Sequence, residues 1–171
     1  GVYAQVNAGA ITLTNDAGEV IDSSAGGAPL VYLHGAGNII VGLDHWVGGW
    51  VDWNIVLDRD GGPNHVGNFC GAPIMIDTDT REVYYTPIYH ILSQLSRTIR
   101  PGDKAVWTRR VLDGLDTDAL HACATVNGDG LLSVQLLNTT TNAIPCKLQI
   151  ADRYAEITIP ANSVQTVRVG L

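Results

Sequence analysis

The sequence of 171 residues contains little cysteine, no cluster of basic residues and no long apolar run. Its three cysteines, Cys70, Cys123 and Cys146, have no close spacing. An odd number of cysteines without such spacing argues against a zinc site and a dense disulfide framework, so we expect free buried thiols, with one disulfide as the alternative. No apolar stretch reaches the roughly 18 residues of a transmembrane helix, and we therefore predict no membrane span.

Positive charge is also scarce. Ten Lys and Arg residues stand against seventeen Asp and Glu residues, which gives a formal net charge of -7. Scattered acidic residues without a basic run argue against nucleic acid or an anionic membrane surface as a partner. The first residues, GVYAQVNAGA, lack the charged and apolar regions of a signal peptide, so the sequence predicts no cellular location.

Apolar residues are abundant, at 46% of the sequence, and predict a globular core. Turn formers at 15–18 separate two β-rich runs in GAITLTNDAGEVIDSS and predict an N-terminal hairpin, and APIMIDTDTREVYYT predicts another around 77–81. Between the two hairpins, GGAPLVYLHGAGNIIVGL predicts a loop, a short strand and an apolar run that could begin a helix. The following GGWVDWNIVLDRDGGPN predicts a strand that is buried on both faces.

The most regular helical pattern lies at about 87–99. Thr86 and Pro87 suit a cap and a first turn, and Pro101 and Gly102 end the pattern. One face of this helix carries apolar residues at helical spacing: Ile88, Ile91, Leu92, Leu95 and Ile99.

From about residue 104 onward, short β-rich runs alternate with turn signals such as NGDG at 127–130, which favours an antiparallel sandwich. The predicted fold class is therefore α+β, mainly β. It consists of an antiparallel β-sandwich, one main helix at about 87–99 and an N-terminal β-hairpin that completes a sheet.

Two family resemblances cover different parts of the chain. Residues 10–43 resemble the N-terminal half of an FKBP-type peptidyl-prolyl isomerase, on the segments LTNDAGEVIDSS, APLVYLHG and GNIIVGL. This resemblance implies an apolar cup that desolvates and twists a prolyl amide. Ile11 stands where that family usually has Tyr, and the rest of the isomerase domain has no counterpart after residue 43. The cup residues that the resemblance implies are Ile21, Asp22, Leu30, Ile39, Ile40 and Leu43.

Residues 38–171 resemble the C-terminal part of glycoside hydrolase family 30, glucosylceramidase type. The resemblance rests on HWVGGWVDWNIVLDRDGGPNHVGNFCGAPIMID, YYTPIYHILSQLSRTIRPG, NGDGLLSVQLLNTTTNAIPCKLQI and AEITIPANSVQTVRV. It implies the last strand, loop and helix of a (β/α)8 barrel, followed by a β-sandwich. It also implies that Trp53 stacks on a sugar, that Asp52 binds sugar hydroxyls and that Asn68 is a loop contact, roles that suit an aromatic ring, a carboxylate and an amide.

The two resemblances meet between about residues 38 and 46, so we interpret the chain as a chimera, natural or engineered. It would have three parts: an incomplete isomerase-like segment at 1–43, a segment from the end of a barrel at 44–103 and a glycosidase-type sandwich at 104–171. An N-terminal hairpin would then find a vacant edge on the sandwich. A homodimer through sheet edges is an alternative way to cover such an edge.

Catalytic residues are not evident. Retaining glycosidases need two carboxylates about 5 Å apart, and the three glutamates, Glu19, Glu82 and Glu156, match no catalytic motif. Surface positions are expected for all three. Asp58 and Asp60 share a strand face, but beside GGPN they are more readily explained as turn formers.

Metal and cofactor sites are not predicted either. The five histidines lack ligand spacing, no glycine segment forms a phosphate loop, and no Ser or Cys has a nucleophile motif. Trp46, Trp50 and Trp53 are more readily explained as core residues than as a sugar platform. Three functions follow from these observations: a non-catalytic chimeric protein, a glycosidase-type protein that takes a β-glucoside or sugar ligand, and a peptidyl-prolyl isomerase or chaperone module.

Overall fold

The computed structural model describes residues 3–7, 10–14, 20–24, 30–63, 66–67 and 69–171. In these residues the chain is mostly β, with antiparallel sheets and two helices, so the predicted fold class is confirmed. Contacts divide the chain into two units. Unit 1 comprises Gly1–Gly35 and Trp50–Ser93, and unit 2 comprises Ala36–Gly49 and Gln94–Leu171.

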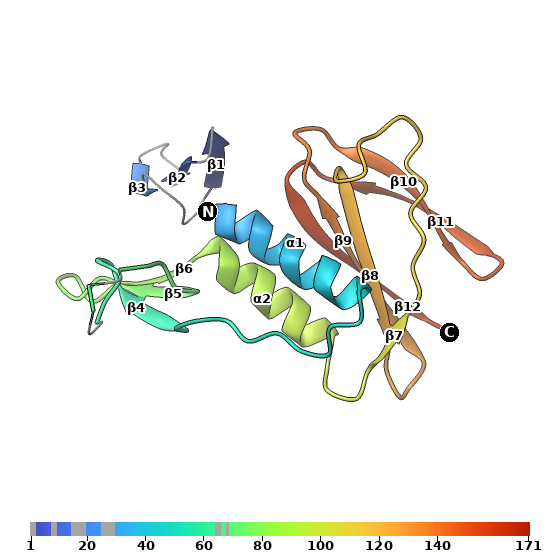
Figure 1. Ribbon diagram of the computed structural model, residues 1–171, viewed down its shortest axis with the longest axis horizontal. Helices are drawn as coiled ribbons and strands as arrows, with labels where there is room; N and C mark the ends of the chain where they lie inside the picture. Colours follow the sequence, from blue (N-terminus) through green and yellow to red (C-terminus); the bar gives the residue numbers. More distant parts are fainter. Residues whose placement is uncertain (1–2, 8–9, 15–19, 25–29, 64–65, 68) are drawn as a thin grey trace. The chain divides into compact units, whose positions relative to one another are not determined.

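Three N-terminal strands form a sheet of their own (Figure 1). β1 (Tyr3–Asn7), β2 (Ala10–Thr14) and β3 (Val20–Ser24) pair in that order, and both pairings are antiparallel. The β2–β3 pair is the predicted hairpin, which is thereby confirmed. Because β1 pairs along the whole of β2, the hairpin completes this sheet and adds no strand to the sandwich sheets.

The first helix, α1 (Leu30–Asp44), occupies a segment for which a loop, a short strand and only the start of a helix were expected. Ala36, Ile39 and Ile40 are buried, and their spacing is that of one helical face. Gly37 lies close to β9, because a Cβ placed on it would be 3.6 Å from the Leu137 side chain. Packing of this face explains why a helix forms where the local pattern also suits a strand.

In unit 1, three short strands form a sheet in the order β4–β5–β6. β4 (Val56–Asp58) is parallel to β5 (Ile74–Ile76), and β5 is antiparallel to β6 (Val83–Tyr85), which confirms the second hairpin. The buried strand expected from residue 50 is wrong, because residues 50–55 precede β4 as an exposed segment. Burial on both faces needs covering layers and neighbouring strands, and β4 pairs only with β5 among the described strands.

The predicted helix is α2 (Pro87–Thr98), and it is confirmed. The carbonyl of Thr86 accepts from the backbone N–H groups of Tyr89 and His90, as expected at a helix start. The buried Thr86 hydroxyl instead bonds the carbonyls of Ala72 and Pro73, at 3.1 and 3.0 Å. The residue before the helix therefore also fixes the segment that leads into β5.

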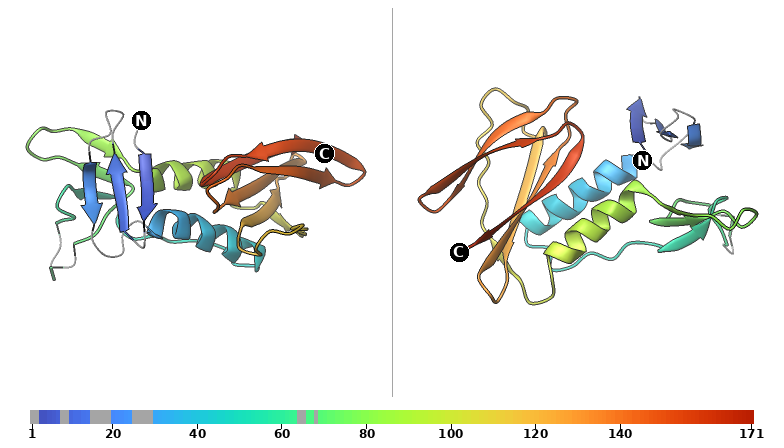
Figure 2. Two further views of the ribbon diagram at one scale, coloured as in Figure 1. Left: turned by 90° about the horizontal axis from the view of Figure 1, so that it is seen from above. Right: turned by 180° about the vertical axis from the view of Figure 1, so that it is seen from behind.

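The sandwich consists of two layers (Figure 2). One is a four-stranded sheet in the order β12–β9–β8–β7, and the other is the β10–β11 pair. The strand bounds are β7 (Lys104–Val106), β8 (Leu120–Val126), β9 (Leu131–Asn138), β10 (Ile144–Ile150), β11 (Arg153–Ile159) and β12 (Ser163–Gly170). Their shared core contains Leu120, Ala122, Ala124, Leu132, Val134, Leu136, Ile144 and Ile159.

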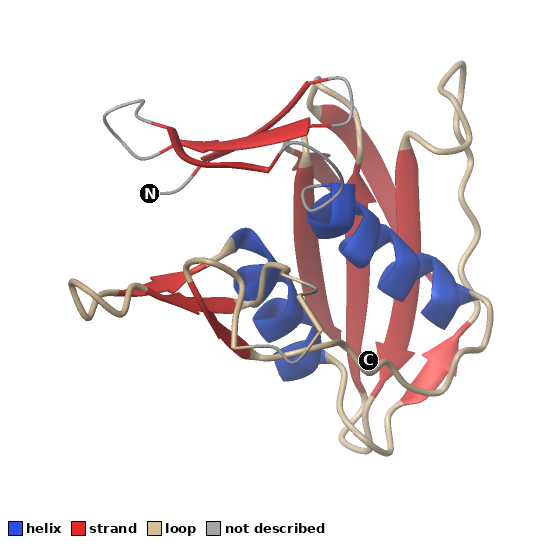
Figure 3. Cartoon of the chain, turned by 60° about the vertical axis from the view of Figure 1, so that its left-hand side comes forward, coloured by secondary structure: helices blue, strands red, loops and turns tan. Residues whose placement is uncertain are grey.

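The opposite face of the four-stranded sheet is covered by helical residues of unit 2 (Figure 3). Gln135 donates to the Thr98 hydroxyl at 2.8 Å and accepts from the Thr166 hydroxyl at 2.5 Å. Gln94 donates to the same Thr166 hydroxyl at 2.8 Å. These bonds satisfy a fully buried amide and hold the end of α2 on β9 and β12. The three cysteines are free thiols, as the first alternative expected, but only Cys123 is buried, whereas Cys70 and Cys146 are partly buried.

Candidate functional site

The residues implied in sugar binding lie in the exposed segment before β4. The Trp53 side chain is 73% exposed, and its backbone N–H donates to Asp52 Oδ1 at 2.8 Å. This bond fixes one carboxylate oxygen of Asp52 and leaves the second for another donor. An exposed indole can stack on the apolar face of a sugar ring, and an oriented carboxylate beside it can accept a hydrogen bond from a sugar hydroxyl. Asn68 lies outside the described residues.

The expectation that the neighbouring tryptophans form a core is wrong. Trp46 and Trp50 are 72% and 44% exposed, and both therefore present aromatic surface to solvent. These aromatic residues therefore do not form a core within the described part of the chain.

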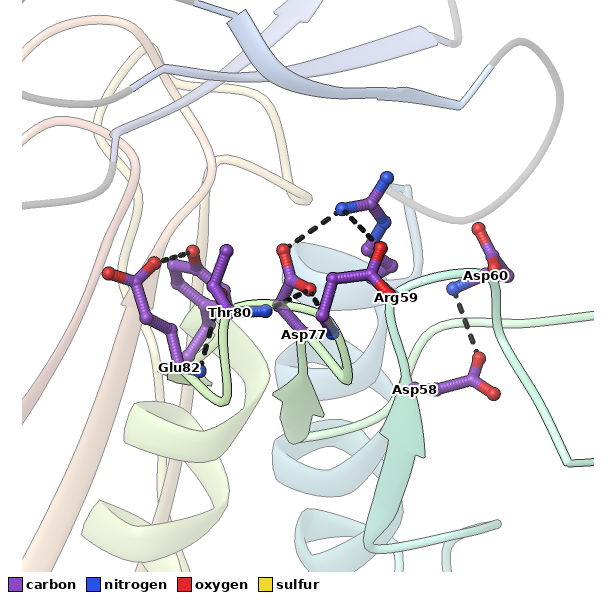
Figure 4. A network of polar contacts seen from close by, with 8 residues as sticks. Asp58, Arg59, Asp60, Asp77, Thr80 and Glu82 are labelled. Carbon is purple, nitrogen blue, oxygen red and sulfur yellow. Dashed lines mark hydrogen bonds and ion pairs between the residues drawn. The ribbon is translucent and has the colours of Figure 1, made fainter.

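The loop that follows β4 is held by Asp58 (Figure 4). Its Oδ1 accepts from the N–H groups of Asp60 at 3.0 Å and Gly62 at 2.7 Å. Gly61 has φ of 86°, and a Cβ there would come within 2.6 Å of the Cys70 carbonyl oxygen. Asp58 therefore forms the turn, as the sequence predicted, and Asp60 supplies one of its N–H donors.

A buried carboxylate joins β4 to the following hairpin. Arg59 donates to Asp77 Oδ2 at 3.0 Å, while Asp77 Oδ1 accepts from the N–H groups of Asp79 at 2.9 Å and Thr80 at 3.2 Å. The Thr80 and Asp79 N–H groups, together with Arg59, hold the pKa of Asp77 below its ordinary value. A carboxylate held ionised in this way serves structure rather than proton donation. The sequence did not reveal this pair, whose members are 18 residues apart.

The two described glutamates, Glu82 and Glu156, are exposed, as expected. Tyr84 donates its hydroxyl to the Glu82 carboxylate, and this bond raises the pKa of Tyr84. Glu156 lies on β11, opposite Lys147 of β10. Glu19 lies outside the described residues. Neither described glutamate has a second carboxylate placed beside it by a hydrogen bond or ion pair.

No metal centre is present within the described ranges, where His, Cys, Asp and Glu side chains form no group of three or more that could hold an ion. His121 is partly buried, and burial together with the charge of Arg110 lowers its pKa. His45 Nδ1 lies 2.8 Å from the Val41 carbonyl at the end of α1. Neither described helix has the length and apolar character needed to cross a membrane.

The implied prolyl cup stays a prediction. Ile39 and Ile40 are buried in the packed face of α1, and Leu43 is partly buried. The side chains of Ile21, Asp22 and Leu30 lie outside the described part of the chain. The described members of this set therefore show no open aromatic-lined cup.

Comparisons with known proteins place two segments in one family. Residues 32–99 match the glycosyl hydrolase family 30 TIM-barrel domain, and residues 111–167 match the glycosyl hydrolase family 30 beta sandwich domain. The first match begins inside the segment that we assigned to an isomerase.

Relatives and solved structures agree with this family. The chain is 34% identical over 137 residues to a Caenorhabditis elegans protein whose name assigns it to the glucosylceramidases, covering 77% of this chain and 26% of that protein. It is 32% identical over 130 residues to the lysosomal acid glucosylceramidase of Mus musculus, covering 75% and 24% respectively. The crystal structure of SrfJ from Salmonella typhimurium has a TM-score of 0.71 and 26% identity, covering 83% of this chain and 30% of that one. The chain thus spans about a quarter of the length of these curated relatives.

Proposed function

Since residues 32–99 and 111–167 belong to glycosyl hydrolase family 30, we propose that the chain binds β-linked glucosides in the manner of a glucosylceramidase-type hydrolase. The ligand class follows from relatives that carry the glucosylceramidase name. Within this chain, the exposed segment before β4 supplies the sugar-binding residues.

The exposed Trp53 indole beside the Asp52 carboxylate carries this proposal. A pyranose ring has an apolar face that packs on an indole, and its hydroxyls donate to carboxylate oxygens. The Trp53 N–H donates to Asp52 Oδ1 and thereby restrains the orientation of the carboxylate. Oδ2 can then accept a hydrogen bond from a ligand. Asn68 would add an amide contact.

The same proposal assigns no hydrolytic step to the described carboxylates. A retaining mechanism needs an acid/base and a nucleophile about 5 Å apart. Glu82 is engaged by Tyr84, Asp77 by Arg59 and Asp58 by its own turn. We therefore expect this chain by itself to bind a β-glucoside without cleaving it.

Hydrolysis of a fluorogenic β-glucoside tests this assignment. The purified chain is compared with a variant that carries E19A, E82A and E156A. We expect no turnover above the buffer rate from either protein. Turnover by the chain that disappears in the triple variant would contradict the proposal and would identify a glutamate-dependent active site.

The isomerase assignment remains a separate prediction without a described contact that favours it. An active module would accelerate a Xaa-Pro refolding phase, which normally takes tens of seconds. We likewise propose a chimeric origin for the chain, with its three parts divided at about residues 43 and 103.

Dimerisation through sheet edges is also a proposal. β7 and β12 are the outer strands of the four-stranded sheet, and an outer strand offers unpaired backbone groups to another chain. Sedimentation at two protein concentrations would detect a dimer.

A further inference from the structure

A second aromatic hollow lies within unit 2. It is shallow and open to solvent: its own volume is about 20 Å³, and the space of about 250 Å³ around it includes open solvent. The hollow is surrounded by the end of α1, by Trp46 after it, and by strands β7 and β8 with Trp107 after β7. Its lining residues are Leu43, Asp44, Trp46, Ala105, Val106, Trp107, Cys123 and Ala124.

Two exposed indoles line this hollow. Trp46 is 72% exposed and Trp107 is 74% exposed, although both contribute atoms to its wall. Large apolar side chains on a folded protein are usually shielded, and those gathered around a concave surface mark a binding site. Each indole therefore offers most of its ring to a ligand.

The backbone fixes Trp46 at this position. The N–H of Val47 donates to the Gly42 carbonyl at 3.0 Å, and the N–H of Trp46 donates to the Leu43 carbonyl at 3.3 Å. These bonds form the motif that ends many helices, in which the left-handed residue is usually Gly. Trp46 takes that position with φ of 68°. A bulky residue in this strained conformation is a sign of a role beyond the turn.

The polar group of the hollow is Asp44, the last residue of α1. The hydroxyl of Thr108 donates to Asp44 Oδ1 at 2.6 Å. This bond orients the carboxylate, and its second oxygen can accept another hydrogen bond. Cys123 lies buried at the same hollow, and burial, with a smaller effect from the charge of Asp44, raises the pKa of its thiol to about 12. The Cys123 side chain is therefore an uncharged part of the wall, not a nucleophile.

We propose that this hollow is a second carbohydrate-binding site. The ring of a glycoside stacks on Trp46 and Trp107, and Asp44 accepts a hydrogen bond from one of its hydroxyls. The choice of a glycoside rests on the function proposed above, whereas the hollow and its residues stand independently of it. Two indoles and one carboxylate also suit a small quaternary ammonium ion, and the experiment separates the two ligands.

The experiment uses the indole N–H signals of the four tryptophans in a 1H–15N NMR spectrum, assigned by single Trp-to-Phe variants. Methyl β-D-glucopyranoside is titrated into the ¹⁵N-labelled chain. We expect the Trp46 and Trp107 signals to move along one common binding curve. W107A should raise the Kd reported by Trp46 by about tenfold, and D44N should weaken binding in the same direction.

W53F is the matched control, because Trp53 is not among the residues that line the hollow. It should leave the Trp46 curve unchanged. Trp107 is mostly exposed, so W107A should retain the backbone spectrum of the folded chain. That spectrum distinguishes lost binding from lost folding.

The outcomes separate this proposal from the proposed function. A moving Trp53 signal with static Trp46 and Trp107 signals would overturn the second site and support the first. Moving Trp46 and Trp107 signals with a static Trp53 signal would support the second site and overturn the first. A response of Trp46 and Trp107 to tetramethylammonium but not to the glucoside would overturn carbohydrate as the ligand.

Discussion

Side chains are far more completely buried in the sandwich of unit 2 than in the short sheet of unit 1. In the sandwich, seven of the eight residues of β9 are buried, because the β10–β11 pair lies on one face and helical residues lie on the other. In unit 1, all three residues of β6 are exposed, and β4 has one neighbour among the described strands. Two covering layers, rather than strand composition, produce the closed core.

The same difference explains where binding residues occur. A side chain in a closed core has its surface used by neighbours, whereas the segment at 50–55 presents aromatic surface to solvent. Binding residues are commonly held on exposed segments next to a rigid framework. In unit 1, the Asp58 turn and the Arg59–Asp77 pair supply the framework beside Trp53.

The largest expected effect comes from opening the sandwich core. Ile159 is fully buried between the two layers, so I159A removes packed methyl groups and leaves a cavity. We expect the free energy of unfolding to fall by about 4 kcal/mol in urea titrations. Ile55 is 69% exposed in unit 1, and I55A should change it by less than about 0.5 kcal/mol. Equal losses in the two variants would remove the contrast between the units.

A smaller loss is expected when a buried amide is removed from the sandwich. Asn138 donates to the carbonyls of Asn142, Ile159 and Pro160, at 2.8, 3.2 and 2.9 Å. N138A removes all three bonds, including the buried one to Ile159, and should reduce the free energy of unfolding by about 2 kcal/mol. Asn142 is exposed, and N142A should be close to neutral. A neutral N138A would show that water replaces the amide.

The smallest predicted effect concerns the acid sensitivity of unit 1. Because the folded pKa of Asp77 lies below its ordinary value of 3.8, its stabilisation is present above that pH and is lost as the pH falls through the lower folded pKa. Protection factors of the β5–β6 hairpin amides, which correct for the intrinsic pH dependence of exchange, should fall as the pH is lowered from about 5 to about 2. D77N should abolish the dependence, while D79N, at an exposed carboxylate, should retain it. Identical profiles for D77N and the unchanged chain would contradict the role of Asp77.

Parts of this structure could be read from local patterns. The spacing from Ile88 to Leu95 predicted α2, and turn formers between β-rich runs predicted the hairpins and sandwich strands. Residues 30–44 and 50–55 could not be assigned in the same way. A short apolar run suits a strand or a helix, and its burial depends on neighbours from elsewhere in the chain.

The candidate sites show the same limit. The adjacent Asp52 and Trp53 could be named from the sequence, because they follow each other directly. The second hollow could not, because Thr108 and Asp44 are 64 residues apart and meet only after α1 packs near β8. Long-range contacts of this kind have no local signature.

Binding of a β-glucoside to the segment at 50–55 tests the central claim most directly. The backbone amide signals of Asp52 and Asn54 are followed by NMR during a titration with methyl β-D-glucopyranoside. We expect W53A to raise the Kd by about tenfold. W50A, in the same segment at a side chain that is 44% exposed, should leave the Kd unchanged. Equal Kd values for W53A and the unchanged chain, or no response of these amides at all, would contradict Trp53 as the sugar-binding residue.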